Sequence, residues 1–86
     1  IFNAIGCRVE VEKMIATGRI DMVVETIHII YVLELKLSNN GGIDAAAEQI
    51  RSRQYAEPFK ADKRRVVALA IELDDKGKGL IDWKEV

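Results

Sequence analysis

The stretch GRIDMVVETIHIIYVLELKL, residues 18–37, contains two strand-like segments that carry charges. Segments 19–26 and 29–37 are rich in β-branched and aromatic residues, which favour strands, and the short link between them favours an antiparallel pair. Asp21, Glu34 and Lys36 lie inside these apolar segments. An ionised side chain in a buried sheet is costly unless it is paired or bound, so the three charges either lie on a solvated edge or form a site.

The alternation of residues along segment 29–37 indicates a central strand. Both of its faces begin apolar, whereas an edge strand would be polar along the whole of one face. Glu34 and Lys36 share a face near the end of this strand and lie about 7 Å apart along it. Antiparallel pairing through a short link brings Asp21 alongside Glu34. Two carboxylates and an amine are therefore expected to converge.

The remaining segments predict one mixed sheet with a helix. Residues 8–14 alternate and precede a Thr-Gly turn, so they add a first strand and complete an antiparallel meander of three strands. Residues 43–56 follow a turn sequence and have the Ala-rich composition of a helix, with Asp44 in its first turn. Residues 66–73 and 80–86 provide two further strands. This order predicts an α/β or α+β sheet with a helix on one face.

Length and charge limit the classes of protein to consider. The 86 residues fit a single domain spanning 1–86, and a core this small favours association, for example as a homodimer. The net charge of −1 excludes a uniform positive field, so contact with nucleic acid requires a local patch. The lone Cys7 fits a reducing, cytoplasmic compartment, and no apolar run is long enough to span a membrane. Because the chain opens with Ile rather than Met, we expect a fragment of a longer protein.

The three charges suggest a specific chemistry. Two close carboxylates repel each other and suit a hard divalent cation, which binds oxygen ligands. A lysine beside them can orient a water molecule or stabilise the charge that develops on an attacked phosphate. The set therefore predicts metal-assisted hydrolysis of a phosphodiester, and a surface cluster of salt bridges is the alternative.

Four segments carry a resemblance to a known family: GRIDMVVE, YVLELKL, AAAEQIRSRQYAEPFKAD and RRVVALAI. Together they resemble the PD-(D/E)xK nuclease superfamily, and more narrowly the nuclease-like domain at the C-terminus of bacterial AAA-ATPase-like proteins. The similarity covers about residues 9–73. It implies a restriction-endonuclease-like core, Mg²⁺- or Mn²⁺-dependent hydrolysis of nucleic acid with DNA as the expected substrate, and an ATPase domain in the same longer chain. A non-catalytic interaction or dimerisation module attached to an ATPase is the alternative.

The resemblance also assigns roles to single residues. It places the family's acidic metal ligands at Asp21 and Glu34, a further ligand at the backbone carbonyl of Leu35, and the catalytic lysine at Lys36. It places the glutamine of the helix motif, a further catalytic residue, at Gln49.

Two more positions match the family less directly. Tyr55 corresponds to the tyrosine of the helix motif, which implies a contact with nucleic acid, and Glu12 matches an acidic position in the preceding strand. The chain departs from the family at Ile20, where the superfamily name expects proline, and in the longer spacing from Gln49 to Tyr55. Many members have an N-terminal helix that supplies another acidic residue, and we expect that this helix lies outside this sequence.

Basic residues cluster around and after the predicted helix: Arg51, Arg53, Lys60, Lys63, Arg64 and Arg65. They either face phosphates, with Arg53 and Lys60 as nucleic-acid contacts, or form an ordinary solvated surface. His28 is expected to face solvent at a hairpin. Residues 74–85 are similar in pattern to a calcium-binding loop. Lys76 and Lys78, however, occupy positions at which such a loop supplies oxygen ligands to the ion, so a glycine-rich hairpin is predicted there.

Overall fold

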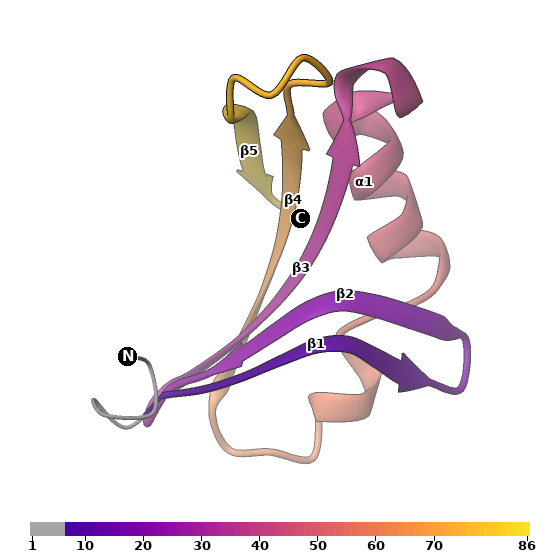
Figure 1. Ribbon diagram of the computed structural model, residues 1–86. Coiled ribbons are helices and arrows are strands. Elements are labelled where there is room, and N and C mark those ends of the chain that lie inside the picture. The colour runs from indigo at the N-terminus through magenta and orange to yellow at the C-terminus, as the bar shows by residue number, and fades with distance from the viewer. Residues whose placement is uncertain (1–6) are drawn as a thin grey trace.

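The computed structural model describes residues 7–86, which form three strands, a helix and two strands in that order (Figure 1). The strands and the α-helix are β1 (Arg8–Ile15), β2 (Gly18–Glu25), β3 (Ile29–Leu37), α1 (Gly42–Ser52), β4 (Arg65–Leu73) and β5 (Leu80–Glu85). Short 3₁₀ helices at Ser38–Asn40 and Glu57–Phe59 flank α1. No helix among the described residues is long and apolar enough to span a membrane.

The five strands form one mixed sheet in the order β1-β2-β3-β4-β5. Neighbouring strands are antiparallel except β3 and β4, which run parallel. A parallel pair needs a crossover connection, and α1 supplies it. The predicted α/β class is confirmed, with its three-strand meander, helix and further strands in one mixed sheet of the restriction-endonuclease-like type.

The core lies between α1 and one face of the sheet. Ile30 and Val32 on β3 and the small residues Ala68 and Ala70 on β4 are at most 7% exposed. They pack against a buried stripe of α1 formed by Ala46, Ala47 and Ile50. The small side chains on both partners let the helix approach the sheet closely.

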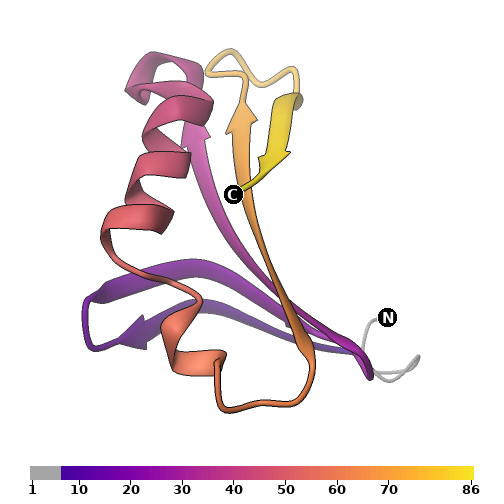
Figure 2. The same ribbon diagram turned by 180° about the vertical axis from the view of Figure 1, so that it is seen from behind.

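The opposite face of the sheet has no helix packed on it within residues 7–86 (Figures 1 and 2). The register places Val11, Met22 and Leu33 on this face, side by side across three strands. On β5, Trp83 lies opposite Ile71 of β4, and both Trp83 and Val11 are 59% exposed. This apolar sheet face is wide and open to solvent.

The β1–β2 hairpin separates from the rest of the sheet halfway along β2. The ladder between β2 and β3 ends at Met22 and Leu33, while β1 and β2 remain paired to the turn. Glu12, which the β1–β2 pairing skips opposite Asp21, has a left-handed φ of 54°. The hairpin therefore bends, and Figure 1 shows its turn lying near the C-terminal end of α1.

Because of this bend, the side chains of residues 19–26 do not show the strict alternation between the two faces of the sheet that the sequence predicts. Ile20 and Val23 would lie on opposite faces of a regular strand, but both belong to the buried core. The end of the hairpin presents its other face to the interior once β2 has left β3.

The helix is shorter than the predicted segment 43–56. It ends at Ser52, and the backbone then makes tight turns in which Gln54 has a φ of 51° and Tyr55 N–H donates to Ile50 O at 3.2 Å. Tyr55 therefore lies beyond the helix rather than on it. At the other end, Glu72 of β4 accepts a hydrogen bond from Ile43 N–H at 2.9 Å and so satisfies one free amide of the first turn.

Candidate functional site

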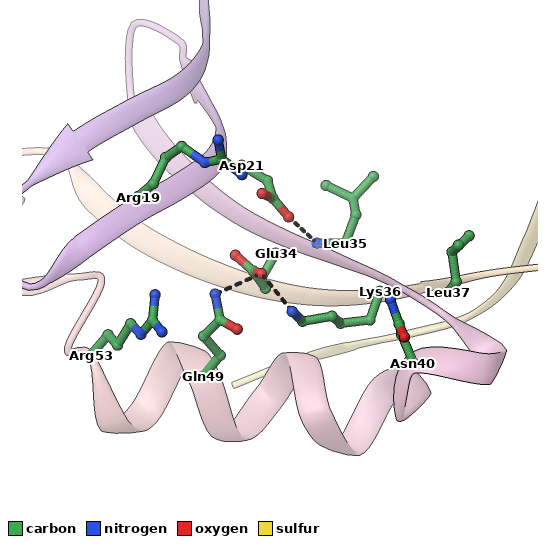
Figure 3. A pocket seen from close by; sticks show the side chains of 9 residues that line it. All are labelled: Arg19, Asp21, Glu34, Leu35, Lys36, Leu37, Asn40, Gln49 and Arg53. Atoms are coloured by element: carbon green, nitrogen blue, oxygen red, sulfur yellow. Dashed lines mark hydrogen bonds and ion pairs between the residues drawn. The ribbon is translucent and has the colours of Figure 1, made fainter.

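A pocket of about 290 Å³ lies where β2 leaves β3, beside α1 (Figure 3). Its walls come from β2, β3, the turn after β3, and α1 with the residue that follows it. The lining residues are Arg19, Asp21, Glu34, Leu35, Lys36, Leu37, Asn40, Gln49 and Arg53. Most of the residues that the sequence singles out therefore meet in one place.

Asp21 takes over a backbone interaction at the point where the strands part. Its Oδ2 accepts a hydrogen bond from the Leu35 N–H at 2.9 Å. The β2–β3 pairing has already ended at Leu33. The carboxylate therefore accepts the hydrogen bond that a backbone carbonyl of β2 would accept if the pairing continued. The bend of the hairpin is thus what directs Asp21 toward Glu34 and Leu35.

Glu34 is the buried acid of the pocket, with only 2% of its surface exposed. Its Oε2 accepts a hydrogen bond from Gln49 Nε2 at 2.8 Å and lies 3.7 Å from Lys36 Nζ. Its Oε1 has no hydrogen-bond partner in the part of the chain that the structure describes. Burial raises the pKa of Glu34, and the nearby charge of Asp21 raises it further. When Glu34 is ionised, its carboxylate therefore has too few hydrogen-bond donors and positive charges around it to offset its burial.

A chain of hydrogen bonds joins Glu34 to the backbone of β2. Gln49 Nε2 donates to Glu34 and also to the Tyr55 hydroxyl at 2.7 Å, so both of its protons are used. The Tyr55 hydroxyl in turn donates to the backbone carbonyl of Arg19 at 2.8 Å. Burial raises the pKa of Tyr55, which keeps the phenol protonated and able to donate.

Tyr55 itself is fully buried and does not line the pocket. Its hydroxyl is occupied by Gln49 and Arg19, so in this arrangement it acts within the protein. The suggested contact between Tyr55 and nucleic acid stays a prediction that this geometry does not support.

The other candidate residues lie in different surroundings. Arg53 lines the pocket. Lys60 forms a 2.5 Å ion pair with Glu57 and lines a second pocket of about 360 Å³, which Tyr55 also lines. Glu12 lies outside the pocket lining and forms a 3.0 Å ion pair with Arg19.

Most of the remaining basic cluster is engaged in ion pairs. Arg51 lies 4.0 Å from Glu48, and Arg65 lies 3.5 Å from Glu85. These contacts are those of a solvated protein surface.

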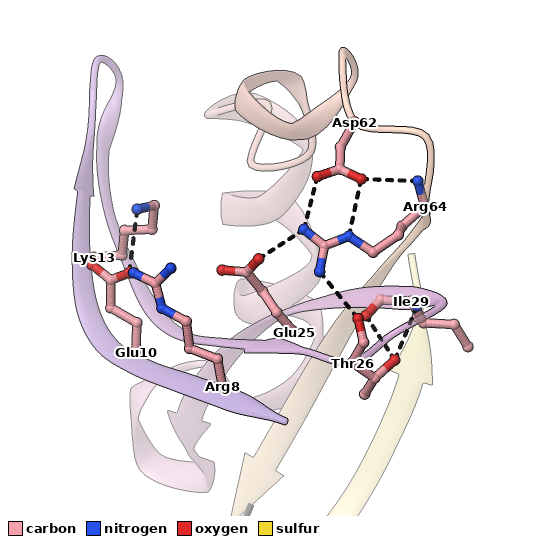
Figure 4. A network of polar contacts seen from close by, with 8 residues as sticks. All are labelled: Arg8, Glu10, Lys13, Glu25, Thr26, Ile29, Asp62 and Arg64. Atoms are coloured by element: carbon pink, nitrogen blue, oxygen red, sulfur yellow. Dashed lines mark hydrogen bonds and ion pairs between the residues drawn. The ribbon is translucent and has the colours of Figure 1, made fainter. Parts of the chain in front are cut away.

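Arg64 ties the β2–β3 link to the segment before β4 (Figure 4). Its guanidinium contacts Asp62 at 2.7 Å, Glu25 at 2.8 Å and the carbonyl of Thr26 at 3.0 Å. The hydrogen bonds from Arg64 hold the pKa of Asp62 well below its usual range. The role of Arg64 in this network is structural.

Arg19 also lines the pocket, although it is not among the site residues that the sequence predicts. It lies two residues before Asp21 on the same strand, and this spacing could have indicated that both side chains point to the same face. His28 is exposed, and residues 74–79 connect β4 and β5 as an antiparallel hairpin, as expected.

The donor set of the pocket suits a hard cation but is small. Within residues 7–86, no three His, Cys, Asp or Glu side chains are grouped so that they could hold a metal ion. The pocket offers two carboxylates, one of which has a buried oxygen with no partner among the described residues. Mg²⁺ is typically bound by one or two carboxylates and completes its coordination with water and substrate oxygens, so the residues present fit such an ion.

Comparison with known proteins gives an independent result. Residues 1–83 match the family model of the PD-(D/E)XK nuclease superfamily. Neither the curated proteins nor the solved structures include a match to the chain. Because the family match covers almost the entire chain, this domain belongs to the PD-(D/E)XK nuclease superfamily.

Proposed function

We propose that the domain hydrolyses phosphodiester bonds in nucleic acid, with Mg²⁺ or Mn²⁺ held by Asp21 and Glu34. The observation that carries this proposal is the buried Oε1 of Glu34, which has no partner among the described residues although Asp21 lies close enough to raise the pKa of Glu34. Two acids so placed are unfavourable for stability and favourable for binding a cation. Nucleases of this superfamily generally use divalent metals, which supports the same reading.

The backbone of Leu35 supports a third oxygen ligand. Its N–H points to the edge of β3 where Asp21 lies. The N–H and C=O of one residue in an extended strand point toward the same edge, so the Leu35 carbonyl is directed to the Asp21 side as well. We propose that this carbonyl joins the two carboxylates as a ligand.

The remaining residues hold and orient the reactants. A divalent cation at this position would supply charge that offsets the two carboxylates and polarises the phosphate. The Lys36 ammonium, which is 28% exposed and lies beside Glu34, orients the attacking water and stabilises negative charge on the phosphate oxygens. Gln49 fixes the orientation of Glu34, and Tyr55 fixes Gln49.

Calorimetric titration with Mn²⁺ tests the metal site directly. We expect the wild-type domain to bind saturably and the Asp21→Asn variant to lose this binding. The matched control is Asp75→Asn, which removes the same charge from an exposed residue of the β4–β5 turn. Equal binding by Asp21→Asn and the wild type would exclude Asp21 as a ligand, and a wild type that binds no Mn²⁺ would exclude the site.

A cleavage assay with Mn²⁺ then tests the reaction. Labelled DNA and RNA, each single-stranded and duplex, are incubated with the wild type and with Asp21→Asn. We propose DNA as the substrate, and cleavage of RNA alone would contradict that part. The resemblance to domains of AAA-ATPase-like proteins is the ground for proposing an ATPase domain in the same longer chain.

The exposed apolar sheet face favours a second candidate, an interaction or dimerisation module attached to an ATPase. Val11 and Trp83 on that face are 59% exposed, and open apolar faces of this width commonly mark interfaces. Light scattering over a concentration series, with Trp83→Ser as the variant, tests association through this face. Association that Trp83→Ser abolishes, in a protein that neither binds Mn²⁺ nor cuts nucleic acid, would favour this function over hydrolysis.

A further inference from the structure

We propose that Arg19 and Arg53 form a phosphate-binding pair at one end of the pocket. Figure 3 shows the Arg19 guanidinium beside Asp21 and the Arg53 guanidinium beside Gln49, both on the side of Glu34 away from Lys36. Their ligand is a backbone phosphate of the nucleic acid, adjacent to the phosphate that is attacked. The identity of this ligand rests on the proposed function, but the binding itself does not require hydrolysis.

The charges of the metal-free pocket favour such a pair. Asp21 and Glu34 repel an anionic backbone, and the chain as a whole has a net charge of −1, so no general attraction brings nucleic acid to the site. Lys36 is already engaged with Glu34 at 3.7 Å. Among the residues that line the pocket, Arg19 and Arg53 are the remaining cations.

Arg53 is held in place without a carboxylate partner. Within residues 7–86, no acidic side chain lies within ion-pair distance of its guanidinium. A Cβ on Gly18 would lie 2.9 Å from Arg53 Nη1 and 3.2 Å from its Cδ, so the side chain lies flat against the hairpin turn. Thr17 Oγ1 also donates to the Arg53 carbonyl at 2.5 Å. A cation placed by contacts but left without a counter-charge is available to an anion.

Arg19 is anchored through its backbone and only weakly paired through its side chain. Its carbonyl accepts the hydrogen bond from Tyr55, which links it through Gln49 to Glu34. Its guanidinium lies 3.0 Å from Glu12, but the two side chains are 54% and 67% exposed, so solvent screens this pair. A phosphate can replace Glu12, because the guanidinium fork matches two phosphate oxygens.

The two arginines also connect the phosphate to the site of reaction. Arg19 lies two residues from Asp21 on the same strand, and Arg53 directly follows α1, which carries Gln49. The contacts of Gly18 and Thr17 with Arg53 join these two elements at the hairpin turn. A phosphate that contacted both arginines would therefore be held close to Glu34 and Asp21.

Fluorescence anisotropy with a labelled oligonucleotide tests the pair. The measurements use the Asp21→Asn background in EDTA, so that binding is read without cleavage. We expect Arg19→Gln and Arg53→Gln each to weaken binding about tenfold and to lower the slope of log affinity against log salt by about 1. Arg19→Lys and Arg53→Lys should keep the salt slope but bind more weakly than arginine, because lysine lacks the fork. Arg8→Gln, which removes a cation of β1 outside the pocket, is the matched control and should bind like its parent.

The outcomes separate this inference from the proposed hydrolysis. Unchanged affinity and salt slope in both glutamine variants, or no binding of the oligonucleotide by the parent, would overturn the pair. If the wild type binds no Mn²⁺ and cuts nothing, but affinity still depends on both arginines, the pair stands and the hydrolysis fails. If the wild type cuts with Mn²⁺ and both glutamine variants keep its KM and kcat, the hydrolysis stands and the pair fails.

Discussion

The Asp21 carboxylate accepts a hydrogen bond from the Leu35 N–H at 2.9 Å, at a level of the sheet where β2 and β3 no longer pair. A side chain has replaced the backbone as the partner of β3. This replacement puts two acids, Asp21 and Glu34, against one short segment of strand. A cost in stability follows for the protein without metal.

We expect Asp21→Asn to stabilise the metal-free domain at pH 7. An asparagine oxygen can still accept from Leu35, while the like charge that raises the pKa of Glu34 is removed. Like charges on facing strands typically destabilise by roughly 0.2–1 kcal/mol, so the free energy of unfolding should rise by about that amount. Urea unfolding in EDTA measures it. A clear loss of stability would show that the Asp21 charge supports the fold rather than a bound cation.

Much of the fold and part of the candidate site could be predicted from the sequence, because both follow from local patterns. The two-residue alternation along β3 puts Glu34 and Lys36 on one face, and the short link to β2 makes Asp21 a neighbour. The parallel β3–β4 pair follows from the helix between them, since parallel strands need a crossover.

The rest depends on contacts between distant segments. Nothing in the sequence marks Glu12 for a left-handed backbone, so the bend of the hairpin and the burial of Ile20 beside Val23 could not be predicted. The use of Glu72 to satisfy the amide of Ile43 joins residues 29 positions apart. The link from Tyr55 to Arg19 spans 36 positions and exists only because the bent hairpin reaches the end of α1.

We expect Tyr55→Phe to destabilise the domain by about 1–3 kcal/mol, because the partly buried partners of the hydroxyl, Gln49 and the Arg19 carbonyl, lose a hydrogen bond. Mn²⁺ affinity should also fall, since Gln49 then holds Glu34 less firmly. Urea unfolding and calorimetry measure the two effects. Tyr31→Phe is the control, because the Tyr31 hydroxyl has no hydrogen bond within residues 7–86 and this variant should be nearly neutral.

The Asp62–Arg64 contact predicts a loss of stability in acid. The folded-state pKa of Asp62 lies well below its usual value near 3.9 because Arg64 donates hydrogen bonds to it. The ionised Asp62 carboxylate therefore adds its full share to the free energy of unfolding above the pKa that Asp62 has in the unfolded chain. This share is lost as the pH falls through the lower pKa that Asp62 has in the folded domain. Urea unfolding between pH 7 and pH 2.5 should show a smaller decline for Asp62→Asn than for the wild type. The exposed Asp75→Asn should follow the wild type, and identical curves for all three proteins would remove Asp62 as a cause.

Lys36 allows metal binding to be separated from reaction. Its ammonium lies beside the Glu34 oxygen that already has a partner, so removing it leaves both carboxylates in place and takes away a cation that competes with metal. We expect Lys36→Ala to keep Mn²⁺ affinity at least as high as in the wild type. Cleavage should fall by about 10²–10⁴-fold, the usual effect of losing a group that positions or stabilises the reacting atoms.

Calorimetry and a cleavage assay on the same preparation make this comparison. Lys84→Ala is the control, because that ammonium pairs with Asp44 at 3.6 Å outside the pocket, and both measurements should stay at wild-type values. Parallel loss of metal binding and cleavage in Lys36→Ala would show that Lys36 holds the site together instead of acting on the phosphate. Full cleavage without Lys36 would move the water-orienting role to another residue of the pocket.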